Sequence, residues 1–172
     1  MRRMIILAVL AAAMFPAFAQ ESAPEAPAWK ERTEKDIKLK WRTDAEFLYV
    51  EVKAPTTGWV AFGIDPEKEM LRADIIIGCV KDGVVLIEDH FGTDPRAHRL
   101  DTELGGEDNL SEKGGEEADG ATILRFRIPL DSGDAYDRPV EPGKEYELLL
   151  AYGATDDLKT RHAARAHFRL VL

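Results

Sequence analysis

Apolar and polar residues alternate along much of this 172-residue chain, and this alternation constrains the fold more than any other feature. Residues 37–41 read IKLKW and residues 122–130 read TILRFRIPL. A period of two is typical of strands with one buried face. Turns rich in Gly and Pro separate about nine such segments, and only 66–73 suggests a helical turn. We predict an all-β fold, an antiparallel β-sandwich, with an up-and-down barrel as the alternative.

Two segments are more continuously apolar than the rest. They are 58–64 (GWVAFGI) and 73–80 (ADIIIGCV), and such runs are typical of strands covered on both faces. The second run is followed by KDG, where Asp82 and Gly83 can adopt positive φ, which predicts a tight hairpin. The polar region 92–120 is expected to be a long loop with one or two short strands.

The amino-terminal region has the pattern of a secretory signal. Arg2 and Arg3 precede an apolar run, and small residues end at Ala19. We expect a signal peptide over 1–19, a flexible leader over 20–36 and one domain over 37–172. No later segment is long and apolar enough to span a bilayer. The mature protein is therefore expected to be periplasmic or secreted and not membrane-spanning.

Composition excludes several functions. The formal net charge is −9, so no basic surface is available for nucleic acid. The single Cys79 cannot form an intramolecular disulfide and is expected to be buried, and no C-x-x-C-H is present for covalent haem attachment. No hydrolase, nucleotide or dinucleotide motif occurs, so we expect a domain without a catalytic centre of its own.

Several motifs together resemble the DOMON domain, the module named after dopamine β-monooxygenase. They are LYVEVKAPTTGWVAFGI, then Met70, then ADIIIG, DGVVLIEDHF and LKTRHAARAHFRL, in that order. The resemblance covers about 36–172. It implies an immunoglobulin-like antiparallel β-sandwich with a ligand pocket between or at the end of its sheets.

The resemblance also implies a ligand. Several DOMON proteins hold a non-covalent haem b between one Met and one His, and these positions fall on Met70 and His162, with Lys159 as a remote alternative to the histidine. Trp59 and Phe62 are candidate pocket residues, although their opposite parity lets at most one face it. The implied function is one-electron transfer to a redox partner protein, for example a membrane cytochrome or a periplasmic oxidoreductase. Other members bind sugars, so a haem-free module for a sugar or another small ligand is the alternative.

Strand parity ranks the histidines independently of the family. If the last strand extends back far enough, His162 shares the inner face with Ala166 and Phe168, whereas His167 points to water. The small alanines beside His162 would leave a slot for a flat ligand. His90 and His98 are expected to be solvated, and each stays an alternative nitrogen ligand. Met70 has the alternative role of a packing residue beneath its loop.

The acidic residues are given structural roles. Asp74 is a carboxylate within an apolar run, which is costly unless it is paired or hydrogen-bonded. We expect it to pair with Arg72 or to cap a turn. The acidic stretch from Glu103 to Asp119 lacks the spacing of an EF-hand loop and is interpreted as solvated.

Overall fold

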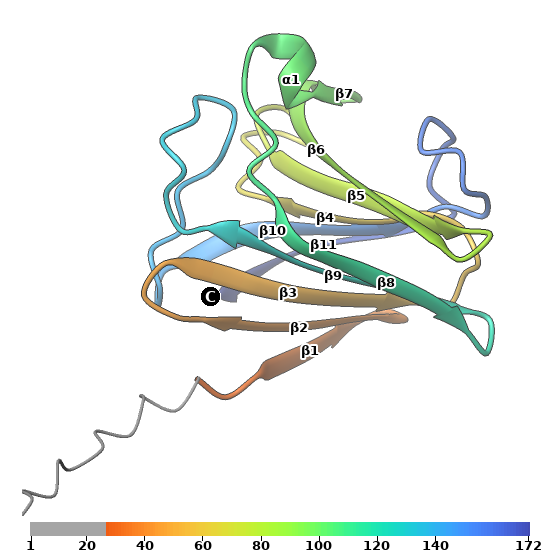
Figure 1. Ribbon diagram of the computed structural model, residues 1–172. Coiled ribbons are helices and arrows are strands. Elements are labelled where there is room, and N and C mark those ends of the chain that lie inside the picture. Colours follow the sequence, from red (N-terminus) through yellow and green to blue (C-terminus); the bar gives the residue numbers. More distant parts are fainter. Residues whose placement is uncertain (1–26) are drawn as a thin grey trace, which may run out of the picture.

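Two antiparallel sheets pack face to face in the computed structural model, which describes residues 27–172 (Figure 1). The five-stranded sheet has the order β1 (Lys30–Glu34), β2 (Ile37–Thr43), β3 (Phe47–Ala54), β9 (Ala121–Pro129) and β8 (Ser111–Ala118). The six-stranded sheet has the order β11 (Ala164–Val171), β10 (Glu145–Tyr152), β4 (Val60–Ile64), β5 (Asp74–Lys81), β6 (Val84–Asp94) and β7 (Ala97–Leu100). One short helix, α1 (Asp101–Leu104), follows β7. The predicted β-sandwich is confirmed, and the barrel alternative is wrong.

The core lies between the sheets and follows the predicted alternation. In β2 the side chains of Ile37, Leu39 and Trp41 are buried, whereas the intervening lysines are more exposed. In β9 the same pattern places Leu124 and Phe126 inward. Because each strand contributes every second side chain to this layer, the alternation sets which residues make the core.

Strands β4 and β5 are buried on both faces, as their apolar runs predict. Ile76 and Val80 face the other sheet, whereas Ile77 and Cys79 form a second small cluster with Trp59 on the outer face. The predicted hairpin between β5 and β6 is present, with positive φ at Asp82 and Gly83. Cys79 is buried, as expected.

The amino-terminal segment differs from the prediction. Strand β1 lies inside the stretch 20–36 that we expected to be a flexible leader, and it pairs with β2 from Lys30↔Trp41 to Glu34↔Ile37. Its side chains are almost all exposed, so the sequence has no buried face to signal a strand. The predicted signal peptide, 1–19, lies outside the described residues. Within 27–172, no helix is long and apolar enough to cross a membrane.

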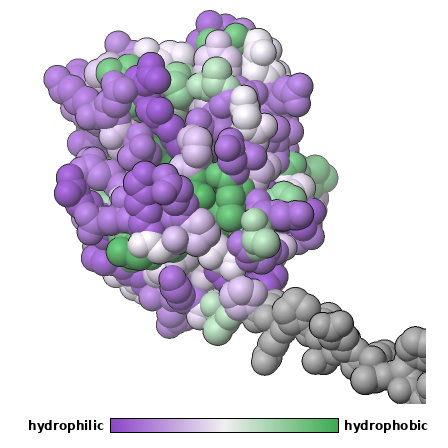
Figure 2. All heavy atoms as spheres, turned by 90° about the vertical axis from the view of Figure 1, so that its left-hand side faces the viewer, coloured by the Kyte–Doolittle hydropathy of each residue, from purple (hydrophilic) through white to green (hydrophobic). Residues whose placement is uncertain are grey.

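Different connections lie at the two ends of the sandwich. The β4–β5 connection and the loop 130–144 between β9 and β10 lie at the left of Figure 1, with α1 above them. The connection between β10 and β11, residues 153–163, lies at the right of that figure. The end at the left is turned toward the viewer in Figure 2, where its surface is mostly hydrophilic around a small hydrophobic centre.

Candidate metal centre

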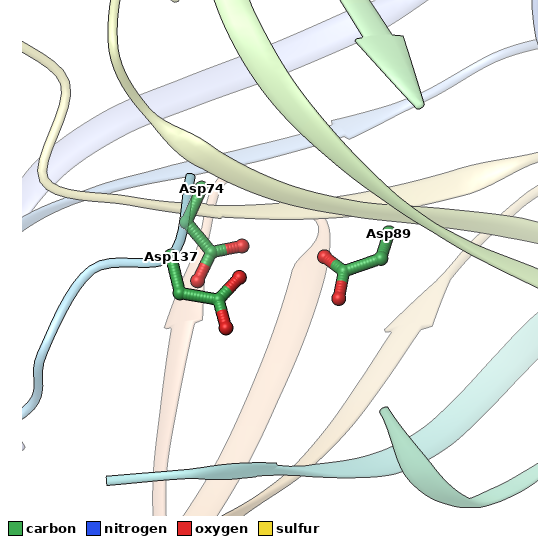
Figure 3. Close-up of side chains that lie close together, drawn as sticks. All are labelled: Asp74, Asp89 and Asp137. Atoms are coloured by element: carbon green, nitrogen blue, oxygen red, sulfur yellow. The ribbon is translucent and has the colours of Figure 1, made fainter. Parts of the chain in front are cut away.

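Three aspartates converge at the left-hand end of the sandwich. Asp74 begins β5, Asp89 lies in β6, and Asp137 lies in the loop between β9 and β10. One carboxylate oxygen from each lies within 4.8 Å of the other two. In Figure 3 the carboxylate of Asp89 points from β6 toward those of Asp74 and Asp137. The sequence separates these residues by up to 63 positions, and the fold brings them together.

The carboxylates are buried without enough partners. Asp74 is 3% exposed and Asp89 is 4% exposed, and the Oδ1 atom of each has no hydrogen-bond partner. Asp101 at the start of α1 is 1% exposed, and neither of its carboxylate oxygens has a partner. Asp137 adds a further unpartnered Oδ1. Among residues 27–172, no Lys, Arg or His forms an ion pair with any of the four.

Hydrogen bonds fix the loop that carries Asp137. The preceding Tyr136 donates its hydroxyl to the Leu104 carbonyl at 2.8 Å and packs edge-on against Phe91, with 5.3 Å between ring centroids. Asp134 accepts the backbone N–H of Glu107 at 2.7 Å. On the other side, Arg138 Nε donates to the Arg72 carbonyl at 2.6 Å. The loop is therefore attached both to the segment after α1 and to the segment before β5.

The electrostatics of the cluster are those of crowded anions. Burial raises the pKa of Asp74 well above its ordinary range, and the charges of Asp89, Asp137 and Asp101 raise it further. Burial, then the charges of Asp137 and Asp101, raises the pKa of Asp89 to about 8. Burial, then the charge of Asp137, raises the pKa of Asp101 to about 7. Burial likewise raises the pKa of Asp137. Asp89 therefore retains a proton at neutral pH unless another cation replaces it.

Of this cluster, only Asp74 is conspicuous in the sequence, and the ion pair expected for it does not form. Asp74 was expected to pair with Arg72, but Arg72 has positive φ and pairs with Glu67 at 2.8 Å. The sequence does carry one indication that Asp74 and Asp89 lie close together, namely that both face the same side of the sheet. The two-residue turn of the β5–β6 hairpin pairs Lys81 with Val84, which places Asp74 and Asp89 on the same side of the sheet.

Met70 lies at the same end of the six-stranded sheet as the carboxylates. It is half-buried in the β4–β5 connection, its N–H donates to the Pro95 carbonyl at 3.4 Å, and its carbonyl accepts from Ala73 at 3.0 Å. A Cβ placed on Gly92 of β6 would lie 1.6 Å from the Met70 oxygen, so the Met70 backbone rests directly on Gly92.

His162 lies at the other end of that sheet. The N–H of the next residue, Ala163, donates to the Tyr152 carbonyl at 2.7 Å, and Tyr152 pairs with Val60 at the start of β4. Strand β11 begins at Ala164, so His162 precedes the strand on which its inward direction depended. The parity itself is confirmed, because Ala166 is buried and Phe168 packs on the core, whereas His167 is exposed.

The strand register keeps Met70 and His162 apart. Strand β4 separates the two ends by four residue steps, about 13 Å at roughly 3.3 Å per residue. The three inter-strand steps from β6 to β10 add about 14 Å sideways at roughly 4.8 Å each. Together these give about 19 Å between the strand positions next to the two residues. This separation argues against joint ligation of one haem iron, and both that ligation and haem b binding stay predictions.

Trp59 and Phe62 lie on opposite faces of the six-stranded sheet, as their parity predicts. Phe62 is 1% exposed in the inter-sheet core, with its ring centroid 6.1 Å from that of Phe126. Trp59 packs on the outer face, and its Nε1 donates to Thr160 Oγ1 at 3.1 Å. Neither contributes to the carboxylate cluster.

His90 and His98 were expected to be solvated, and this expectation is wrong. His90 is 9% exposed and His98 is half-buried, and their rings are in contact. Packing of β7 against β6 accounts for the difference, because Gly92↔His98 pairing brings the second histidine beside the first.

A shallow groove of about 310 Å³ lies on the five-stranded sheet. It is lined by Trp29, Glu31, Lys40, Glu51 and Arg125. Trp29 is 49% exposed, and the Arg42 guanidinium lies over its ring at 5.3 Å from the centroid. Glu51 accepts from Arg125 at 2.6 Å and from Lys40 at 3.1 Å. The groove thus combines a partly exposed tryptophan with charged hydrogen-bonding groups.

Comparison with known proteins places this sandwich among related domains. The family model described as "DOMON domain" matches residues 33–153. The chain is 30% identical over 129 residues to DBH-like monooxygenase protein 2 of Mus musculus, covering 69% of this chain and 19% of that protein. It is 31% identical over 124 residues to MOXD1 homolog 2 of Drosophila melanogaster, covering 70% of this chain and 16% of that protein. The chain therefore spans less than a fifth of the length of these two relatives.

Solved structures share the fold at low sequence identity. The cytochrome b domain of pyranose dehydrogenase from Coprinopsis cinerea superposes with a TM-score of 0.62 at 14% identity, covering 83% of this chain and 80% of that one. The cytochrome domain of Myriococcum thermophilum cellobiose dehydrogenase gives 0.58 at 12% identity, covering 90% of this chain and 80% of that one.

Proposed function

Because this chain belongs to the DOMON domain family, we propose that it is a binding module whose buried carboxylate cluster holds a divalent cation, with Ca²⁺ as the best match. One observation carries the proposal: four aspartates at one end of the sandwich have buried carboxylate oxygens with no hydrogen-bond partner. Buried charges are retained in proteins when they are paired or coordinate a metal. A cation held by Asp74, Asp89 and Asp137 supplies the missing partner for these three and offsets the charge of the neighbouring Asp101.

The donor set favours Ca²⁺. Every donor is a carboxylate oxygen, which suits hard cations and is unsuited to softer metals that select imidazole and thiolate. Oxygens on opposite sides of Ca²⁺ lie about 4.8 Å apart, since Ca–O bonds are about 2.3–2.6 Å, whereas Mg²⁺ needs bonds of about 2.0–2.1 Å. The three ligand oxygens lie within 4.8 Å of one another, which is compatible with Ca²⁺.

Binding would join parts of the chain that otherwise repel each other. Asp74 and Asp89 belong to neighbouring strands, Asp101 to α1, and Asp137 to the loop between β9 and β10. A cation shared by Asp74, Asp89 and Asp137 turns their repulsion into attraction and pins the loop to the six-stranded sheet. Extracellular calcium modules bind with Kd near 10⁻⁴–10⁻³ M, which suits the secreted location expected from the signal sequence.

Calorimetry and thermal unfolding of the full chain test this function. After removal of metal by a chelator, Ca²⁺ should bind at one equivalent and raise the Tm, and Mg²⁺ should bind more weakly. Asp74→Asn should abolish the Ca²⁺-dependent rise in Tm. Asp82→Asn, which changes an exposed carboxylate in the β5–β6 turn, should leave it intact. A Tm that Ca²⁺ does not change in the wild-type protein would refute the proposal.

The groove on the five-stranded sheet supports a second candidate function, binding of a sugar. Saccharides pack on exposed aromatic rings and accept hydrogen bonds from charged side chains, and Trp29 with Lys40 and Arg125 offers both. Titration with cello- and xylo-oligosaccharides should then give binding that Trp29→Ala removes and Asp74→Asn retains. A redox partner is expected only if haem binds.

A further inference from the structure

A second group of possible metal ligands lies on the outer face of the six-stranded sheet. Asp89 faces inward in β6, so its neighbour His90 faces outward. His98 of β7 pairs with Gly92 and lies on the same outer face. The two Nδ1 atoms are 3.1 Å apart, and the ring centroids are 4.8 Å apart. Two imidazoles thus direct nitrogen atoms toward one position, away from the carboxylate cluster.

Glu88 orients this pair. Its carboxylate lies 3.0 Å from His90 Nε2, so that nitrogen carries the proton and Nδ1 keeps a free lone pair. In metal-binding histidines the second ring nitrogen commonly donates to a carboxylate, which fixes the tautomer and the ring direction. His98 Nδ1 donates to His90 in the absence of metal. A metal ion takes the place of that shared proton once His98 carries its hydrogen on Nε2.

The separation of the nitrogens suits one metal ion. Two imidazole nitrogens at about 2.0–2.1 Å from a tetrahedral metal lie about 3.3 Å apart. The observed 3.1 Å is close to this value. His90 is 9% exposed, and a neighbouring carboxylate holds its ring, so little side-chain freedom remains to be lost on binding.

The backbone of Met70 lies over the same face, which makes its thioether a candidate soft donor. Its carbonyl oxygen occupies the position that a Cβ on Gly92 would need, and Gly92 is the cross-strand partner of His98. The Met70 backbone therefore lies over the outer face, beside the strand position that pairs with His98. A thioether selects soft ions, above all Cu(I).

We propose that His90 and His98, oriented by Glu88, bind a transition-metal ion on the outer face of β6 and β7, and that Met70 supplies a thioether that favours Cu(I). This site shares no ligand with the carboxylate cluster. It also gives Met70 a role that does not require His162.

Metal titration of the tag-free full chain tests the site. Cu(I) competed against a chromophoric chelator should bind at one equivalent, and Cu(II) should show nitrogen hyperfine coupling from two imidazoles. His98→Gln should weaken Cu(I) binding at least 100-fold, and Glu88→Gln about 10-fold through loss of orientation. His167→Gln is the matched control, because His167 is an exposed histidine that also pairs with a glutamate on this sheet.

The outcomes separate the parts of the proposal. Wild-type binding no tighter than that of His98→Gln, or equal loss in His167→Gln, would overturn the histidine site. Met70→Leu should weaken Cu(I) about 10-fold and leave Zn²⁺ unchanged, and unchanged Cu(I) binding would overturn the thioether assignment. Ca²⁺ stabilisation should persist in His98→Gln, which confirms that the variant is folded and that the two sites are independent.

Discussion

Asp89 and His90 are neighbours in β6, yet their side chains lie on opposite faces of the six-stranded sheet. Asp89 joins Asp74 and Asp137 between the sheets, whereas His90 contacts His98 outside them. Strand alternation therefore assigns oxygen donors to the inner face and nitrogen donors to the outer face of the same strand. The two faces should respond to different metals, and each can be changed without touching the other.

Asp89→Asn should stabilise the metal-free protein and remove its response to Ca²⁺. The amide retains an oxygen for the Asn109 N–H, which Asp89 accepts at 3.2 Å, and it removes one of the mutually repelling charges. We expect a gain of about 1–2 kcal/mol at pH 8 without metal, since each pKa unit corresponds to about 1.4 kcal/mol. Denaturant unfolding with chelator and with Ca²⁺ measures both effects. A variant less stable than the wild type under chelator would argue against repulsion in the cluster.

Metal-free stability should fall as pH rises from 6.5 to 8.5. The pKa of Asp89 is raised to about 8 in the folded state from an ordinary 3.8, so the folded protein holds a proton that the unfolded chain has lost. Stability contributed by that proton is present at lower pH and disappears through the folded pKa. His98 and His162 have lowered pKa values and oppose this trend only below their ordinary 6.5.

The expected fall is about 1–2 kcal/mol over this window, measured by urea unfolding at each pH with chelator present. Saturating Ca²⁺ should largely remove it, because bound carboxylates are ionised throughout. Calcium affinity should rise with pH as protons cease to compete. Metal-free stability that increases between pH 6.5 and 8.5 would contradict the raised carboxylate pKa values.

Gly92→Ala should destabilise the fold by about 3 kcal/mol, near the upper end for overpacking. The new Cβ would lie 1.6 Å from the Met70 oxygen and 2.7 Å from its carbonyl carbon, so the backbone of the β4–β5 connection has to move. Gly114→Ala is the control, because a Cβ there meets nothing within 4 Å. Its effect should stay within about 0.5 kcal/mol. Equal stabilities of the two variants would show that Met70 does not rest on Gly92.

Much of the fold could be predicted from local pattern. The strands β2 and β9 follow from the alternation of apolar and polar side chains, because the core needs one continuous apolar face. The Asp82–Gly83 turn follows from the backbone preferences of these two residues. Strand β1 could not be recognised, since its exposed side chains carry no alternation. Strand β1 forms because each of its residues pairs with a residue of β2 in an antiparallel ladder.

The sites could be predicted only in part. The β5–β6 hairpin fixes that Asp74 and Asp89 share a face, which is local information. Asp137 arrives through a loop held by Tyr136 and Arg138, and no sequence period reports such contacts. The relative position of Met70 and His162 depends on the strand order of the six-stranded sheet, which the sequence does not reveal. That order puts the beginnings of β5 and β11 at opposite ends.

Haem titration should separate Met70 from His162. If both ligated one iron, Met70→Ala and His162→Ala would abolish the same six-coordinate spectrum. Because β4 and three inter-strand steps lie between them, we expect His162→Ala to leave any haem absorbance of the wild-type protein unchanged in both oxidation states. Reduced spectra of both variants, recorded after haem loading and gel filtration, measure this. The contrary result is sharp α and β bands in the wild type that both variants lose equally. It would mean that the 153–163 connection rearranges to bring His162 across the sheet. The cytochrome function implied by the family would then be restored.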